Sequence, residues 1–97
     1  MTRRVIDRIR EKIRLQQYDM TVHAMEEMAE DNLNILDIEH TILDGQISKI
    51  EKGDPRGTKY VVEGLAVDGQ TPVGTVGRFA NERYLIITVY EVTSSEG

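Results

Sequence analysis

The sequence contains no cysteine and no tryptophan among its 97 residues. The absence of cysteine excludes a disulfide framework, a thiolate nucleophile and a cysteine zinc site. Aromatic residues make up only 5% of the chain, so we expect an aliphatic core of Ile, Val, Leu and Met. Chains of this length support one hydrophobic core. The sequence therefore predicts a single domain over residues 1–97, with a helical part at 1–45, an antiparallel sheet at 46–92 and a loose tail at 93–97.

Long apolar runs are also missing from the sequence. The longest are about five residues, far below the ~20 residues that a transmembrane helix needs. The N-terminus alternates Arg with Ile and has no apolar segment of the kind that signal peptides carry. We therefore expect a cytoplasmic protein with no membrane partner.

Positive charge is absent from the middle of the chain. Residues 15–44 carry eight acids and no base, whereas residues 1–14 carry six bases against two acids, and residues 45–97 are close to neutral at −1. Binding to nucleic-acid phosphates depends mainly on clustered Lys and Arg, so the net charge of −5 is unfavourable for general nucleic-acid binding, and we expect no DNA partner. The basic block can still bind a phosphate, and the acidic block can bind a basic partner. Alternatively, both blocks are solvated helix faces.

The spacing of apolar residues in the first half of the chain predicts three helices, at residues 2–16, 21–31 and 34–45. Thr21 and Asn34 have side chains that suit N-cap positions. Asn32 tolerates the left-handed backbone found at helix ends, and Gly45 is a typical helix stop. These end signals define the second and third helices more sharply than the first.

The second half of the chain has the alternation of strands, predicted at residues 46–52, 58–67, 71–79 and 84–92. Asp68-Gly69 and Asn81-Glu82 are turn sequences between successive strands. Together with the helices, this order predicts an α+β fold in which the N-terminal helices pack on one face of a four-stranded antiparallel sheet.

Strand alternation also predicts which side chains face the helices: Leu85, Ile87, Val89, Val73, Thr75, Gly77 and Phe79. The remaining positions then share the face that no helix covers: Tyr84, Ile86, Thr88, Tyr90 and Arg78. A shift by one residue would invert this assignment. We expect Arg78, Thr88 and Tyr90 to line one concavity on the open face, with His23 near its rim.

The order of several motifs resembles a known prokaryotic family. The segments "MTVHAMEEMAEDNLNILDIEHTILDGQI", "KYVVEGLAVDGQTP" and "YLIITVYE" resemble members of domain of unknown function 4258, and the resemblance covers roughly residues 5–92. Members of that family are often regarded as relatives of RelE-type and MqsR-type toxins, which are small metal-independent ribonucleases. The resemblance therefore implies an RNA substrate, a protein antitoxin as partner and no cofactor.

The resemblance also implies which residues act. The His of the family's His-Ala motif corresponds to His23, and the Thr and Tyr of the closing strand correspond to Thr88 and Tyr90. A histidine can take a proton from a ribose hydroxyl near neutral pH. In a metal-free ribonuclease an arginine stabilises the charge of the transition state, and we assign this role to Arg78. Tyr90 can donate a proton or stack on a base, so the predicted catalytic residues are His23, Arg78 and Tyr90.

RNA contacts are expected from Arg56 and Lys59, which flank the turn at Gly57, and from Thr88. The two histidines lie 17 residues apart (23 to 40) with no ligand pair at helical spacing, so we expect no metal site.

Structural roles remain open for each of these residues. His23 can instead bond Glu27 one turn later, and Arg78 can pair with Glu82 or Glu91. Tyr90 can pack against its cross-strand neighbours. In these roles the three side chains would stabilise the fold and take no part in catalysis. Two alternatives to a ribonuclease also remain, a non-catalytic interaction module of the same fold and a small-ligand-binding protein.

Overall fold

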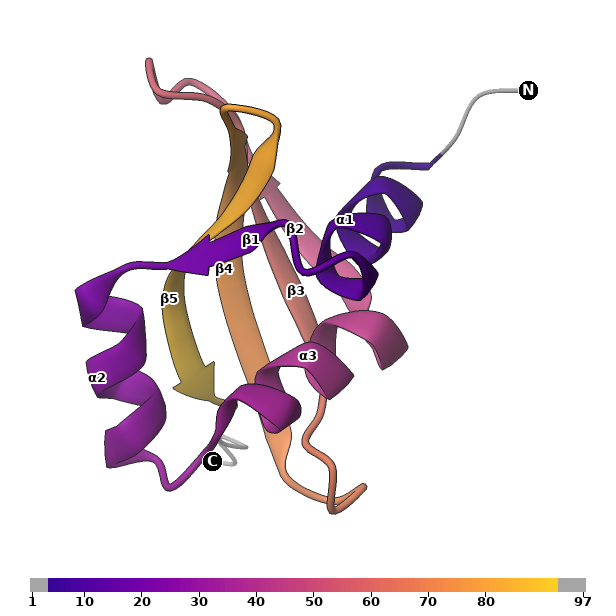
Figure 1. Ribbon diagram of the computed structural model, residues 1–97, viewed down its shortest axis with the longest axis vertical. Helices are drawn as coiled ribbons and strands as arrows, with labels where there is room; N and C mark the ends of the chain where they lie inside the picture. Colours follow the sequence, from indigo (N-terminus) through magenta and orange to yellow (C-terminus); the bar gives the residue numbers. More distant parts are fainter. Residues whose placement is uncertain (1–3, 93–97) are drawn as a thin grey trace.

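A computed structural model describes residues 4–92 of the protein (Figure 1). Its helices are α1 (Val5–Arg14), α2 (Val22–Glu30) and α3 (Ile35–Asp44), and its strands are β1 (Tyr18–Met20), β2 (Gln46–Glu51), β3 (Lys59–Leu65), β4 (Pro72–Ala80) and β5 (Arg83–Glu91). The α+β class and the three helices are confirmed. The start of the first helix, predicted at residue 2, and the tail predicted at 93–97 lie outside the described residues.

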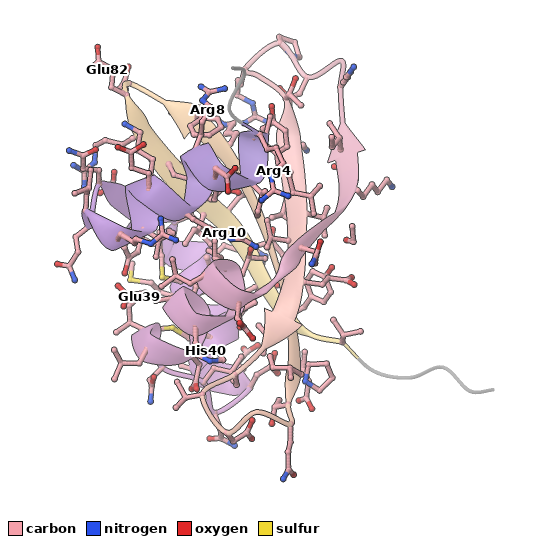
Figure 2. All side chains as sticks on the ribbon, turned by 90° about the vertical axis from the view of Figure 1, so that its right-hand side faces the viewer. Arg4, Arg8, Arg10, Glu39, His40 and Glu82 are labelled. Carbon is pink, nitrogen blue, oxygen red and sulfur yellow. The ribbon has the colours of Figure 1, made fainter. Side chains whose placement is uncertain are left out.

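The elements form two layers. All five strands belong to one sheet in the order β1-β5-β4-β3-β2. In Figure 1, α1 and α3 cross in front of the sheet and α2 lies beside β5. The view along the sheet in Figure 2 shows helices on one side only, so the other face of the sheet is open. Within residues 4–92, no helix has the length and apolar content that crossing a bilayer requires.

The prediction of four antiparallel strands is wrong by one strand. β1 lies between two helices in the sequence and pairs with β5 in parallel, with Tyr18 opposite Tyr84 and Met20 opposite Ile86. Three residues are too few for a period-2 pattern, so this strand exists only because β5 offers it a free edge. The predicted helical part, 1–45, therefore also contributes a strand, and the sheet is mixed.

The predicted end signals of the second and third helices are confirmed by local geometry, whereas the first helix ends at Arg14 and not at residue 16. The Thr21 side chain caps α2 by accepting a hydrogen bond from the Ala24 N–H, at 3.0 Å. Asn34 and Asp37 form a reciprocal capping box at the start of α3. Asn32 has a φ of +58° between these two helices. Each of these end structures depends on residues within one helical turn, so the local sequence suffices to predict it.

The predicted alternation in the last strand is wrong for its first half. Tyr84 and Ile86 are fully buried beneath the helices together with Val89. The register of β4 and β5 shifts between Val76 opposite Thr88 and Gly77 opposite Ile86, which leaves Ile87 as an extra, bulged residue. A bulge inverts the alternation on one side of itself.

The same bulge explains which predicted positions are right. Val89, after the bulge, faces the helices as expected, whereas Leu85 and Ile87 do not. Directly paired residues of neighbouring strands lie on the same face. Because Arg78 pairs with Leu85, and Val76 pairs with Thr88, these positions are all on the open face.

The helix α2 protects the outer edge of β5 beyond the end of β1. The N–H of Thr21 and its Oγ1 donate to the carbonyl oxygens of Ile86 and Ile87, at 3.0 and 2.9 Å. One turn into α2, the Glu27 Oε1 accepts the N–H of Val89 at 3.0 Å. Unpaired strand edges invite association with other chains, and these bonds close the edge.

Four basic residues in and just before α1 make contacts within the fold: Arg4, Arg8, Arg10 and Lys12. The Arg8 guanidinium lies 4.6 Å from the centre of the Phe79 ring, and Arg10 Nη2 donates to the carbonyl of Gly45 at 2.7 Å, where α3 ends. Lys12 donates to the carbonyl of Glu82 at 2.7 Å, and Arg4 pairs with Asp7. Figure 2 shows Arg8 and Arg10 on the side of α1 that meets the rest of the molecule. These four residues of the basic block are thus engaged within the fold, whereas Arg14 is exposed and Arg3 lies outside the described residues.

Tyr84 offers a test of the core, because its hydroxyl is buried and has no hydrogen-bond partner among the described residues. Its ring packs edge-on against Phe79, with centroids 5.4 Å apart. A buried polar group without a partner is destabilising. Tyr84→Phe is therefore expected to raise the free energy of unfolding by about 1 kcal/mol, measured by urea denaturation.

Tyr90→Phe is the matched control, because it removes a hydroxyl that is hydrogen-bonded to Glu63 and should not stabilise the protein. A loss of stability in Tyr84→Phe would mean that an ordered water satisfies the hydroxyl.

Candidate functional site

The open face of the sheet contains a hollow of about 160 Å³ where the β2–β3 loop folds over it. Its lining comes from four separate parts of the chain: Thr21, Asp54, Arg56, Lys59, Arg78, Leu85 and Ile87. Three of these side chains are basic and one is acidic. The hollow thus gathers the predicted residues Arg56, Lys59 and Arg78, which are spread over β3, β4 and the loop before β3.

A tight turn shapes the loop at this hollow. The Gly57 N–H donates to the Asp54 carbonyl at 2.9 Å, and the Asp54 Oδ1 accepts the N–H of Arg56 at 2.8 Å. Gly57 has a φ of +129°, a backbone conformation that residues other than glycine rarely adopt. Arg78 Nη1 donates to the Arg56 carbonyl at 3.2 Å, which ties the turn to the face of β4.

The charges in the hollow are not balanced. Asp54 Oδ1 lies 3.3 Å from Arg56 Nε, and Asp54 Oδ2 lies 3.6 Å from Lys59 Nζ. Hydrogen bonds from the Arg56 side chain and backbone, assisted by the nearby positive charges, lower the pKa of Asp54 to about 2. Within residues 4–92, by contrast, no carboxylate pairs with Arg78, whose side chain donates to the carbonyl of Arg56. The predicted alternative pairing of Arg78 with Glu82 or Glu91 is therefore not what the structure has.

The remaining lining residues are either apolar or already hydrogen-bonded within the protein. Leu85 and Ile87 lie on the open face because of the bulge, and they form the hydrophobic part of the lining. The Thr21 hydroxyl donates to the Ile87 carbonyl and is not a free donor. An apolar wall next to a cation lowers the local dielectric constant and strengthens its interaction with an anion. The hollow can thus bind a phosphate through Arg78.

Two predicted residues share the open face without lining this hollow. Tyr90 pairs with Gly74, over which its ring lies, and its hydroxyl donates to Glu63 Oε2 at 3.2 Å. Burial, followed by the charge of Glu63, raises the pKa of Tyr90. Thr88 lies next to Val76 on the same face. The predicted common face is confirmed, but the hollow at Arg78 is not the concavity that we expected it to share with Thr88 and Tyr90.

His23, at the second position of α2, does not line the hollow, although Thr21 two residues earlier does. Its Nε2 is 3.3 Å from Glu27 Oε2, and its side chain is 65% exposed. This is the alternative contact that the sequence left open. Glu27 in turn accepts the Val89 N–H, so His23 extends a contact that fixes α2 against β5. The other histidine, His40, has its Nδ1 2.8 Å from the Leu65 carbonyl oxygen.

Metal ligands do not gather in the part of the chain that the structure describes. No three side chains of His, Asp or Glu within residues 4–92 are placed to hold a metal ion together.

Residues 20–91 match the family described as domain of unknown function (DUF4258). The match covers most of the chain and includes every residue that lines the hollow. The chain belongs to this family. No curated protein and no solved structure matches it. Within this DUF4258 chain, α1 lies outside the matched segment, so the candidate site belongs to the part of the fold that defines the family.

Four lining residues of the DUF4258 hollow were not predicted as site residues: Thr21, Asp54, Leu85 and Ile87. Asp54 begins an Asp-Pro-Arg-Gly turn, and such a turn is a local signal that its carboxylate bonds the following backbone. No comparable signal marks Leu85 or Ile87, because their exposure follows from the bulge.

Proposed function

We propose that this DUF4258 protein binds the phosphate backbone of RNA at the hollow beside Arg78 and acts as a metal-independent endoribonuclease of the toxin type. The observation that carries the proposal is the Arg78 guanidinium, which has no carboxylate partner within residues 4–92 and lies beside Arg56 and Lys59. A guanidinium presents planar donors that match two phosphate oxygens. Lys59 and Arg56 would add longer-range attraction for the polyanion, although Asp54 reduces it.

The proposed reaction transfers no group to the protein. A base removes the proton of the 2′-hydroxyl, the oxygen attacks the adjacent phosphorus, and the 5′-oxygen leaves with a proton. Arg78 would stabilise the extra negative charge on the phosphoryl oxygens. His23 is the proposed base, and Glu27 would orient its ring. Tyr90 is the proposed acid, provided that RNA displaces its hydrogen bond to Glu63.

The wider context of the proposal follows from the resemblance to RelE-type and MqsR-type toxins. Such toxins have a protein antitoxin that holds them inactive. We therefore propose an antitoxin as a partner, and the cytoplasm as the place where the protein meets RNA.

The first test is cleavage of single-stranded RNA in excess chelator. If the proposal holds, the RNA is cut and the products carry 2′,3′-cyclic phosphate ends, because the 2′-hydroxyl is the nucleophile. His23→Ala should lower the rate by roughly 10²–10⁴, the usual contribution of a general base. RNA affinity should stay unchanged, since a neutral imidazole contributes little to phosphate binding.

His40→Ala is the matched control, because this second histidine bonds the Leu65 carbonyl and does not line the hollow. Equal rates for the two histidine variants would remove His23 from the mechanism. Cleavage that stops in chelator would contradict the metal-independent reaction altogether.

A non-catalytic interaction module is the second candidate, and the position of His23 favours it. His23 does not line the hollow, and its contact with Glu27 reinforces the attachment of α2 to β5. Intact RNA after incubation with the purified protein, together with normal growth of cells that express it without a partner, would support this candidate.

A further inference from the structure

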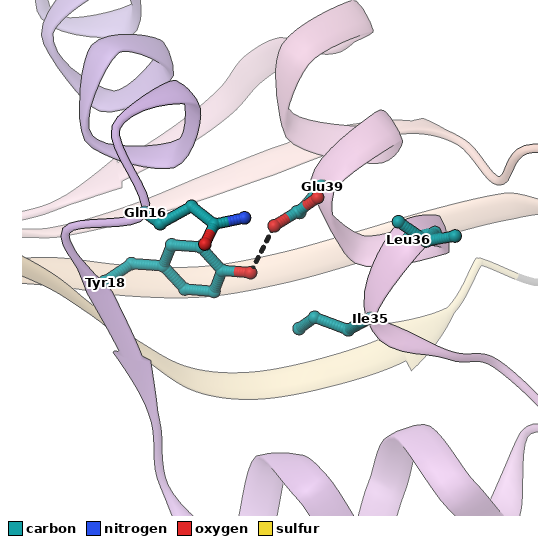
Figure 3. A pocket seen from close by; sticks show the side chains of 5 residues that line it. All are labelled: Gln16, Tyr18, Ile35, Leu36 and Glu39. Carbon is teal, nitrogen blue, oxygen red and sulfur yellow. Dashed lines mark hydrogen bonds between the residues drawn. The ribbon is translucent and has the colours of Figure 1, made fainter.

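A second hollow lies on the helix side of the sheet, between β1 and α3. It has a volume of about 400 Å³ and is lined by Gln16, Tyr18, Ile35, Leu36 and Glu39. Figure 3 shows Gln16, from the loop after α1, and Tyr18, the first residue of β1, extending toward α3. The Tyr18 hydroxyl donates to Glu39 Oε2 at 2.5 Å and closes one side of the hollow. This groove has no part in the RNA site, which lies on the other face of the sheet.

Large apolar side chains are exposed at and next to the groove. Leu36 is 61% exposed and its neighbour Ile35 is 38% exposed, both in the first turn of α3. Leu15, which immediately precedes Gln16, is also exposed. Single exposed apolar residues are common, but apolar residues that adjoin a hollow are typical of docking sites.

The one charged side chain that lines the groove is acidic, Glu39. All five lining residues come from residues 15–44, a segment that carries eight acids and no base. Asp19 is already paired with Arg83. Among the described residues, however, the side chains of Glu26, Glu30, Asp31 and Asp44 make no ion pair or hydrogen bond, and Glu39 Oε1 accepts none. These carboxylates can attract a basic partner.

We propose that this groove binds a basic amphipathic helix of a partner protein. Its apolar side chains would fill the hollow beside Ile35 and Leu36, and its Lys or Arg side chains would meet Glu39, drawn also by the negative charge of residues 15–44. The α1 helix of a second copy has the right charge, but its apolar face of Ile6, Ile9 and Ile13 is buried in its own core. The proposal does not depend on RNA cleavage, which concerns the opposite face.

A synthetic helical peptide tests the proposal without knowledge of the natural partner. Its sequence places Leu on one face and Lys on the other. A second peptide is identical except that Glu replaces every Lys. Fluorescence anisotropy of the labelled peptides should show that the Lys peptide binds at least about tenfold more tightly. Its affinity should fall as salt is raised, because exposed charges are screened.

Variants of the full chain then locate the binding surface. Leu36→Ser should weaken the Lys peptide roughly tenfold, as expected for a central apolar contact. Ile50→Ser is the matched control, since Ile50 is an exposed apolar residue of β2, at the far edge of the sheet from β1. Glu39→Gln should reduce both affinity and salt dependence while keeping an acceptor for Tyr18, whereas Glu82→Gln in the β4–β5 turn should change neither.

Three outcomes would overturn the proposal. The first is equal binding of the Lys and Glu peptides. The second is an equal loss of affinity in Leu36→Ser and Ile50→Ser, with both variants unfolding at the temperature of the parent protein. The third is self-association in sedimentation experiments that Leu36→Ser abolishes, because the groove would then bind a second copy of the chain.

Discussion

Replacing Arg78 by alanine is expected to lower the rate of RNA cleavage by roughly a hundredfold to a thousandfold. This is the usual effect of removing one preorganised hydrogen-bond donor to the charge that develops in the transition state. Arg78 is the one cation of the hollow that no carboxylate pairs with among residues 4–92. Its charge is therefore available to the phosphate in the ground state and, more strongly, in the transition state. Single-turnover kinetics with labelled single-stranded RNA, alongside direct measurement of RNA affinity, checks the prediction.

The conservative variant separates charge from geometry. Arg78→Lys keeps the positive charge but loses the planar pair of donors, so it should recover only part of the rate. Arg83→Ala is the matched control, because Arg83 is paired with Asp19 at 2.8 Å and does not line the hollow. If Arg83→Ala and Arg78→Ala slow cleavage equally, the effect comes from the overall charge and not from the hollow.

Replacing Gly64 by alanine is expected to lower the free energy of unfolding by about 3 kcal/mol, at the upper end of the usual cost of overpacking. A Cβ at Gly64 would lie 2.4 Å from the carbonyl oxygen of Thr41 and 2.9 Å from the Cα of Gly45. Both are backbone atoms, so no side chain can rotate away to make room. The end of α3 would have to move off β3, which is a large loss for a domain whose total stability is about 5–15 kcal/mol.

Gly69→Ala provides the comparison for this stability measurement. Gly69 has a φ of +73° in the β3–β4 turn, but a Cβ there meets no atom within 4 Å. Its replacement should cost only the strain of a left-handed alanine, about 1–2 kcal/mol. If urea denaturation gives Gly64→Ala no larger a loss than Gly69→Ala, then α3 and β3 are not in close contact at this point.

Local structure was predictable because it depends on neighbours in the sequence. The caps at Thr21 and at Asn34 with Asp37 each involve residues three positions apart. Asn81 and Glu82 both adopt positive φ, +55° and +62°, and form the two-residue turn expected between β4 and β5. In these places the chemistry of a short segment suffices to choose its conformation.

The candidate site was predictable only in part. Arg56, Lys59 and Arg78 were recognised as residues suited to phosphate, and the structure brings them to one hollow. Their meeting depends on Arg78 donating to the carbonyl of Arg56, 22 residues away in the chain. No pattern within either segment encodes that contact, so the sequence predicted the residue types but not the hollow that they share.

The α+β class, the three helices and the turn positions follow from short-range features of the sequence, because periodicity and caps act over a few residues. The parallel pairing of β1 and the bulge at Ile87 became known from the three-dimensional structure alone. A three-residue strand has too little pattern of its own, and a bulge arises from the register between two strands. Both features depend on contacts with β5 or β4, and the shape of the open face follows from them.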